Sequence, residues 1–266
     1  MYASFLLWIR LSICSLALFT ASIFDLVERE IPDSVWLSSG PLLALLTALW
    51  LYREPALIPM ALLSMALAFS LSVALFYSGL MGGADSKAIA LVAIAFPLGP
   101  GQEHRGPLYV HPFLPLASFL NALALSTLMA FYMLFRNLAW KLRTGLSFFG
   151  GLEGPWYVKA LVLLSGYKVE ARRLLELKDV FPLELVEEAG GPGPVRRRLA
   201  LSMGLGDEER LEALREAVRK GLVEDYVWIS PGLPMVAFIT VGFLLAYYIG
   251  DLLTYALRAI LTSLLA

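Results

Sequence analysis

The sequence predicts an all-α integral membrane protein: a bundle of six transmembrane helices, with an α-rich cytoplasmic soluble module between the fifth and sixth helices. Three observations lead to this fold class. Of the 266 residues, 59% are hydrophobic and only 16% are charged, whereas soluble domains carry about 25% charged residues. Six apolar stretches lie along the chain, and a long charged stretch separates the last two. This pattern excludes a disordered chain, a secreted disulfide scaffold and an ordinary water-soluble enzyme.

The six apolar stretches are the predicted membrane helices, because about 20 apolar residues cross the hydrocarbon of a bilayer. The first covers residues 3–26, and Arg10 is its only charge before Asp25. Its apolar core is long and no cleavage signal follows it, so we expect a retained helix and no signal peptide. The remaining stretches cover 35–52, 56–80, 84–96, 112–135 and 234–265. The fourth rises only about 20 Å and is too short to cross unaided.

The charged stretch, residues 136–225, holds 15 of the 21 Lys and Arg residues and 14 of the 22 Asp and Glu residues. Within it, residues 174–178 and 208–218 have the spacing of amphipathic helices. Asp207 is the expected N-cap of the second of these, and Gly221 its expected stop. We therefore divide the chain into three parts: transmembrane helices 1 to 5 over 1–136, the soluble module over 137–228, and the last helix over 229–266.

The charge distribution predicts orientation and excludes several partners. Basic residues favour the cytoplasmic side, which places the module inside the cell and both termini outside. The formal net charge of −1 gives no basic surface for nucleic acid. A single cysteine, Cys14, and two histidines, His104 and His111, predict neither a disulfide nor a metal centre, and no cofactor is expected.

Ionisable groups at the ends of membrane helices are costly and mark functional sites. Asp25 ends the first helix, and Asp85 begins the fourth on the same predicted side, so the two carboxylates can meet across the bundle. Gly82 and Gly83 precede Asp85 and permit a tight turn. Two carboxylates in one site share a proton and can activate a water molecule, one as base and the other as acid.

These residues resemble the signatures of the type IV prepilin peptidases, a family of GxGD-type aspartic membrane proteases. The stretch DLVEREIPD at 25–33 is similar to the sequence around the first catalytic Asp of that family, and GGADSKA at 82–88 is similar to the second. Three later stretches are similar to sequences in the archaeal branch, the preflagellin (archaellin) and prepilin peptidases. They cover residues 166–169, 181–184 and 228–234. The resemblance extends from the first helix to the last.

The resemblance implies an aspartic endopeptidase that removes the short basic leader from archaellin or type IV pilin-like precursors at the cytoplasmic face of the cell membrane. It assigns catalysis to Asp25 and Asp85, and turn formation to Gly82 and Gly83. Ala84 stands where the pattern has its second glycine, and a left-handed conformation would be unfavourable there.

The expected partners are the precursors and membrane lipids, with the oligomeric state undecided. Because the paired cysteines of bacterial relatives are missing, we expect cleavage without methyl transfer.

Several residues have a structural interpretation beside a functional one. Lys87 is expected to extend toward lipid head groups, with an accessory role in orienting substrate as the alternative. Asp33 is interpreted as an N-cap of the second helix. Asp251, in the last apolar stretch, fits a structural hydrogen bond better than catalysis, unless a broken helix at Gly250 makes it part of a proton relay.

Two other functions compete with the peptidase. A proton- or cation-coupled transporter would use Asp251 together with the other membrane carboxylates, but the sequence has no internal repeat to favour it. A non-enzymatic scaffold that binds partners through the charged module would leave Asp25 and Asp85 unexplained.

Overall fold

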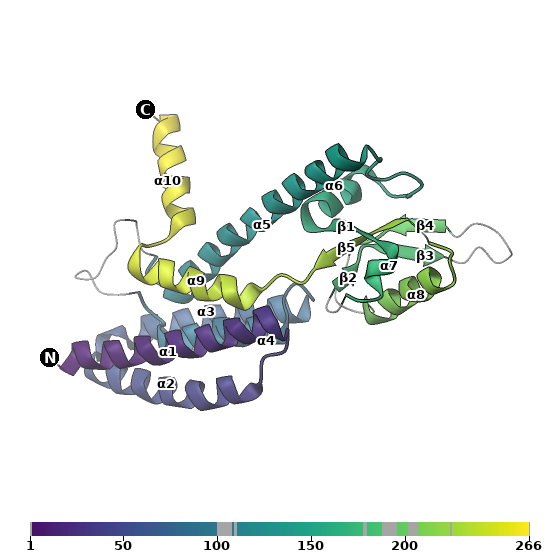
Figure 1. Cartoon of the computed structure of the whole chain (residues 1–266). Helices are drawn as coiled ribbons and strands as arrows, with labels where there is room; N and C mark the ends of the chain where they lie inside the picture. Colours follow the sequence, from purple (N-terminus) through teal and green to yellow (C-terminus); the bar gives the residue numbers. More distant parts are fainter. Residues whose placement is uncertain are drawn as a thin grey trace. The chain divides into compact units, whose positions relative to one another are not determined.

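The computed structural model describes residues 2–99, 108, 111–177, 180–187, 196–201, 207–223 and 225–265. The chain forms two compact units, residues 1–126 with 234–266 and residues 127–233 (Figure 1). In the first unit the elements are α1 (Tyr2–Val27), α2 (Asp33–Arg53), the 3-10 helix η1 (Pro55–Leu57), α3 (Ile58–Tyr77), α4 (Gly83–Ala95), the start of α5 (Leu114–Thr144), α9 (Met235–Tyr248) and α10 (Leu252–Leu265).

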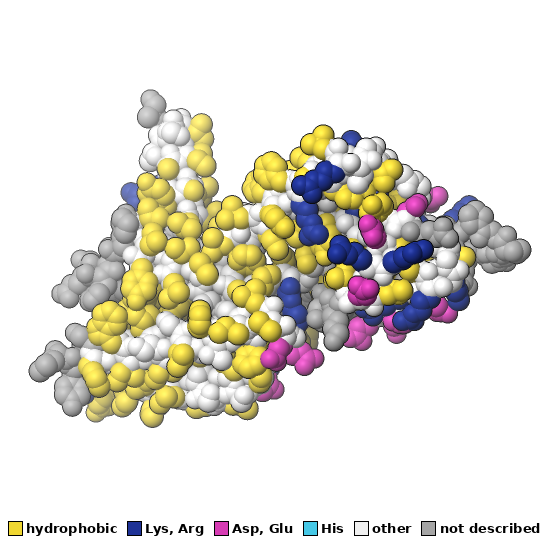
Figure 2. All heavy atoms as spheres, viewed as in Figure 1, with side chains coloured by type: hydrophobic (Ala, Val, Ile, Leu, Met, Phe, Trp, Pro, Cys, Tyr) yellow, Lys and Arg dark blue, Asp and Glu magenta, His cyan; other side chains and the backbone are white. Residues whose placement is uncertain are grey.

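The first unit is a helical bundle in which α4 contacts α1, α2, α3 and α9, and α1 also packs along α2 and α9. Its core consists of aliphatic side chains and rings, with Leu18, Leu43 and Phe243 fully buried. Gly242 lets α9 approach α5 closely, because a Cβ atom there would lie 2.4 Å from the carbonyl oxygen of Ser118. Figure 2 shows hydrophobic side chains over the outside of these helices, as expected for a lipid-facing surface.

Four helices are long and apolar enough to cross a membrane, and a fifth span results if α9 and α10 are taken together. The expected six spans are therefore not all found in the part of the chain that the structure describes. The fourth predicted stretch forms α4, whose 13 residues rise only about 20 Å and cannot cross a bilayer alone.

The sixth predicted stretch is not one continuous helix, because α9 and α10 meet at a bend of 61°. Gly250 adopts a φ of +124° at the break. Glycine adopts this conformation readily, because it has no Cβ atom. Asp251 caps α10: its carboxylate accepts hydrogen bonds from the backbone of Leu253 and Thr254, each 3.1 Å long, and from the Thr254 hydroxyl. Asn121 of α5 accepts a bond from the backbone of Leu252 at 2.9 Å. The structural hydrogen bonds expected of Asp251 are present, and so is the break at Gly250 on which the proton-relay alternative depends.

The second unit contains strands as well as helices, so the prediction of an all-α chain was wrong, although the chain is mostly helical. After the end of α5 it contains α6 (Trp156–Ser165), β1 (Tyr167–Glu170), α7 (Ala171–Leu174), β2 (Val180–Pro182), β3 (Glu184–Glu187), β4 (Arg196–Leu199), α8 (Asp207–Arg219) and β5 (Tyr226–Pro231). β5 lies between β1 and β2 in an antiparallel sheet, and β3 pairs with β4 in a hairpin. Strands of three to six residues are too short to give a clear alternating pattern.

The helices of the module agree with the sequence only in part. α8 matches the amphipathic helix predicted over 208–218, and Gly221 follows it with a φ of +69° as its stop. Asp207 was expected to be the N-cap, the residue just before the helix, but it is the first helical residue of α8. The helix predicted over 174–178 is instead the single turn α7, which ends at Leu174.

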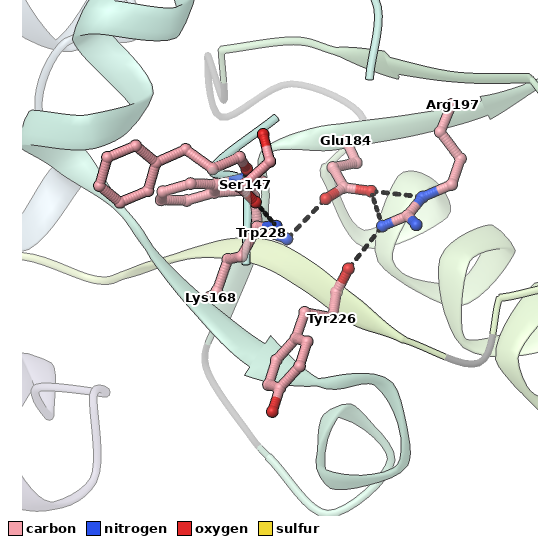
Figure 3. Close-up of polar contacts among 7 residues, drawn as sticks. Ser147, Lys168, Glu184, Arg197, Tyr226 and Trp228 are labelled. Atoms are coloured by element: carbon pink, nitrogen blue, oxygen red, sulfur yellow. Dashed lines mark hydrogen bonds and ion pairs between the residues drawn. The ribbon is translucent and has the colours of Figure 1, made fainter. Parts of the chain in front are cut away.

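A buried ion pair joins the β3–β4 hairpin to β5 (Figure 3). The fully buried side chain of Glu184 accepts hydrogen bonds of 2.6 and 2.9 Å from Arg197 and one of 2.7 Å from the backbone N–H of Trp228. Arg197 also donates to the carbonyl oxygen of Tyr226 at 2.7 Å. Burial raises the pKa of the Glu184 carboxyl, while the positive charge of Arg197 lowers it.

Lys168 of β1 lies next to this pair and contributes to the same interior. Its ammonium group is 4.8 Å from the ring centroid of Trp140 and donates to the carbonyl oxygen of Ser147 at 3.1 Å. Burial lowers the pKa of the Lys168 amine. The charged groups of the module interior thus have partners from several elements.

We predict that Glu184→Ala destabilises the protein by about 3–5 kcal/mol, because it leaves Arg197 and the Trp228 N–H without their acceptor. Glu212→Ala is the control, since Glu212 forms exposed ion pairs with Arg215 and Arg219, which contribute at most about 1 kcal/mol each. The free energy of unfolding of the full chain in detergent micelles measures both changes. Equal losses for the two variants would contradict a structural role of the buried pair.

Candidate functional site

Asp25 lies in the last turn of α1, with 9% of its surface exposed. Its Oδ2 atom accepts a hydrogen bond of 3.1 Å from the backbone N–H of Val236, and the N–H of Ala237 also donates to the carboxylate. Both donors belong to the first turn of α9, where backbone N–H groups have no partner within the helix. The Asp25 side chain of α1 is therefore a hydrogen-bond acceptor for N–H groups at the start of α9, more than 200 residues later in the sequence.

Hydroxyl groups fix α1 against α9 immediately beside this contact. The Ser22 and Thr240 hydroxyl oxygens are 2.7 Å apart, and Thr240 lies 3.2 Å from the carbonyl oxygen of Leu18. Ser22 precedes Asp25 by three residues, so it lies on the same face of α1. The start of α9 is thereby held at a fixed height along α1, which orients the Asp25 carboxylate.

Asp85 is the third residue of α4, and Gly82 is the N-cap. Its Oδ2 atom accepts a hydrogen bond of 2.9 Å from the backbone N–H of Gly82, which is half of a capping box. Gly82 has an ordinary extended conformation, with a φ of −73°. Ala84 is helical and needs no left-handed conformation, so alanine fits where the family pattern has glycine.

Asp25 and Asp85 lie near the ends of α1 and α4 that the sequence predicted to face the same side. Both belong to the first unit, in which α1 and α4 are in contact. Arg29, just after α1, also acts electrostatically on Asp25. It is the one non-glycine residue with a positive φ, +60°, in the described part of the chain. The α9 donors could not be found from the sequence, since no local pattern indicates a contact across 200 residues.

The two ends of α4 are anchored to neighbouring helices by polar contacts. Near the first turn, the Ser72 hydroxyl donates to the carbonyl oxygen of Ser86 at 2.8 Å. At the far end, the buried Arg10 guanidinium donates to the carbonyl oxygen of Ala95, to which Thr47 also donates. These contacts satisfy the end of a short helix inside the bundle, where water is scarce.

Lys87 forms an ion pair with Asp33 at 2.5 Å, across the start of α2. Both side chains are about half exposed or more. The structure therefore gives Lys87 a carboxylate partner, where the sequence predicted lipid head groups. Asp33 is the first residue of α2 and makes no capping bond, so the N-cap interpretation was wrong.

The cysteine and the described histidine have structural surroundings. Cys14 is fully buried in the bundle core. His111 accepts a local hydrogen bond from the backbone of Phe113, and His104 lies outside the described residues. Across the described residues, no group of three or more His, Cys, Asp and Glu side chains could hold a metal ion.

Two family models and two relatives match this chain. Residues 12–134 match the model of the type IV leader peptidase family, and residues 158–252 match that of the archaeal peptidase A24 C-terminus, type II. The preflagellin peptidase of Methanococcus voltae is 24% identical over 243 residues, which cover 89% of this chain and 93% of the relative. The preflagellin peptidase of Methanococcus maripaludis is 24% identical over 252 residues, with the same coverage.

We predict that Lys87 is coupled energetically to Asp33 and not to Asp85. A double-mutant cycle with Lys87→Met and Asp33→Asn should give a coupling of about 0.2–1 kcal/mol in the free energy of unfolding, typical of an exposed ion pair. The matched cycle with Lys87→Met and Asp85→Asn should give none. A larger coupling in the second cycle would contradict the prediction, because it would mean that the Lys87 ammonium group interacts with Asp85 more strongly than with Asp33.

Proposed function

The chain belongs to the type IV leader peptidase family, and from this premise we propose that it is an aspartic endopeptidase of the membrane. Its substrates are archaellin or type IV pilin-like precursors, from which it removes the basic leader peptide at the cytoplasmic face. The preflagellin peptidases that it resembles over 89% of its length support the substrate class. The single observation that supports the mechanism is that Asp25 and Asp85 belong to α1 and α4, two helices in contact within one unit.

In the proposed reaction, one carboxylate removes a proton from water while the oxygen of that water attacks the carbonyl carbon of the scissile peptide. The other carboxyl group then donates its proton to the leaving nitrogen as the C–N bond breaks. Both carboxylates lie at the first turn of a helix, which favours a negatively charged group, so we assign the base from the number of donors: two N–H groups of α9 donate to Asp25. Asp85, held by the Gly82 N–H alone, is then the acid.

A transporter that uses Asp251 is not favoured. The carboxylate of Asp251 is fully buried and accepts three hydrogen bonds at the start of α10. Capping uses three of the roughly four acceptor positions of this carboxylate, which supports a structural role over a relay.

We predict that Asp25→Asn and Asp85→Asn each lower precursor cleavage by roughly 10²–10⁴-fold or more, because general acid–base catalysis contributes at least that much. The assay follows the mobility shift of a precursor incubated with membranes that contain each variant. Asp33→Asn is the matched control, since it removes a nearby exposed acid outside the pair. Near-normal cleavage by either catalytic variant, with the protein folded and inserted, would refute the paired-acid mechanism.

The turn before Asp85 yields a second prediction. A Cβ atom at Gly82 would lie 3.3 Å from Asp85 Oδ2, whereas one at Gly83 would lie 3.6 Å from a ring carbon of Phe76, an ordinary contact. Gly82→Ala should therefore displace the Asp85 carboxylate and lower kcat by roughly tenfold, because small misplacements of a catalytic group are costly. Gly83→Ala should retain cleavage. If Gly82→Ala has full activity, the Asp85 position does not depend on this turn.

A further inference from the structure

An exposed apolar stripe runs along α5 into the second unit. α5 has 31 residues and a length of about 46 Å, more than the roughly 30 Å of hydrocarbon in a bilayer. Its uncharged part ends at Arg136, yet exposed large side chains continue at helical spacing to the last turn. The side chains of this stripe are Leu128, Phe131, Phe135, Leu138 and Leu142.

α6 has a second apolar face without a partner. Its buried side, with Val162, packs into the core of the module. Its other side carries Trp156, Tyr157, Leu161 and Leu164, which are 37–81% exposed. Ten residues rise only about 15 Å, so α6 cannot cross a bilayer.

α6 is fixed rigidly to α5. The buried amide of Asn137 donates to the carbonyl oxygens of Leu163 and Gly166, at 2.9 and 2.8 Å, at the end of α6. The exposed apolar residues of the two joined helices are together called the α5–α6 face here. It consists of Leu138, Leu142, Trp156, Tyr157, Leu161 and Leu164.

The charges around the α5–α6 face are almost all positive. Residues 127–165 contain one acid, Glu153. Figure 2 shows Lys and Arg side chains beside the hydrophobic ones over this part of the unit. The basic residues of this segment are Arg136, Lys141, Arg143 and Lys159.

We propose that the α5–α6 face lies in the interfacial layer of one bilayer leaflet, with α6 parallel to the membrane surface and the basic residues bound to anionic lipid head groups. The stripe lies within α5, which is itself a candidate membrane span, and this favours lipid over a soluble partner. Tryptophan and tyrosine are typical of the membrane interface. Apolar faces flanked by Lys and Arg are the pattern of interfacial helices. The proposal is independent of the catalytic assignment.

The test compares two leucines of the module that are equally exposed, Leu161 on the α5–α6 face and Leu222 after α8, each 45%. Single-cysteine chains, Leu161→Cys and Leu222→Cys in a Cys14→Ala background, are labelled with an environment-sensitive fluorophore. The full-length proteins are reconstituted into phosphatidylglycerol–phosphatidylcholine vesicles. Quenching is measured with nitroxide-bearing lipids and with iodide on both sides of the membrane. Trp156→Cys provides a second position on the face should Leu161→Cys fail to fold.

We expect blue-shifted emission and strong quenching by the lipid nitroxide for the label at 161, and quenching by iodide for the label at 222. Iodide quenching at both positions would overturn the proposal. Shielding of position 161 from both quenchers would also overturn it. Such shielding would mean a second copy of the chain if it depended on the protein-to-lipid ratio, and packing against the rest of the chain if it did not.

Discussion

The hydrogen bonds from the start of α9 to Asp25 are the contact on which the proposed site depends. They solve two physical problems at once, because the first turn of α9 needs acceptors and a buried carboxylate needs donors. The contact also determines which part of α9 lies beside α1, and the Ser22–Thr240 pair fixes the same alignment. The orientation of Asp25 therefore depends on packing between the first and the penultimate helices.

A second constraint is the short helix α4. A helix that ends inside a bundle leaves carbonyl groups that cannot reach water, and each unsatisfied group is costly. The protein places a buried arginine and a threonine at that end, while the other end presents Asp85. Arg10 also lies over the rings of Trp50 and Phe96, at 4.7 and 4.8 Å. These contacts explain the buried charge of Arg10 by its structural role, and no transport function is needed to explain it.

The sequence was sufficient for the properties that follow from composition and helical periodicity. It indicated the long apolar helices, the charged insertion and α8, and it placed Asp25 and Asp85 at helix ends that topology allows to meet. It failed where long-range contacts decide the structure. β1 pairs with β5 about 60 residues later, and such a pairing has no local signature that periodicity analysis can detect. The break at Gly250 was only an alternative in the sequence, because it depends on Asn121 from another helix.

The module is inserted between α5 and α9, so the bundle is discontinuous in sequence. Both carboxylates leave the ribosome within the first third of the chain, but the donors for Asp25 emerge only after residue 233. During translation, the nascent protein therefore carries its two acids for a long interval without the helix that orients one of them. Completion of the site is tied to synthesis of the C-terminal segment, so that a truncated product retains the acidic residues in an unassembled form.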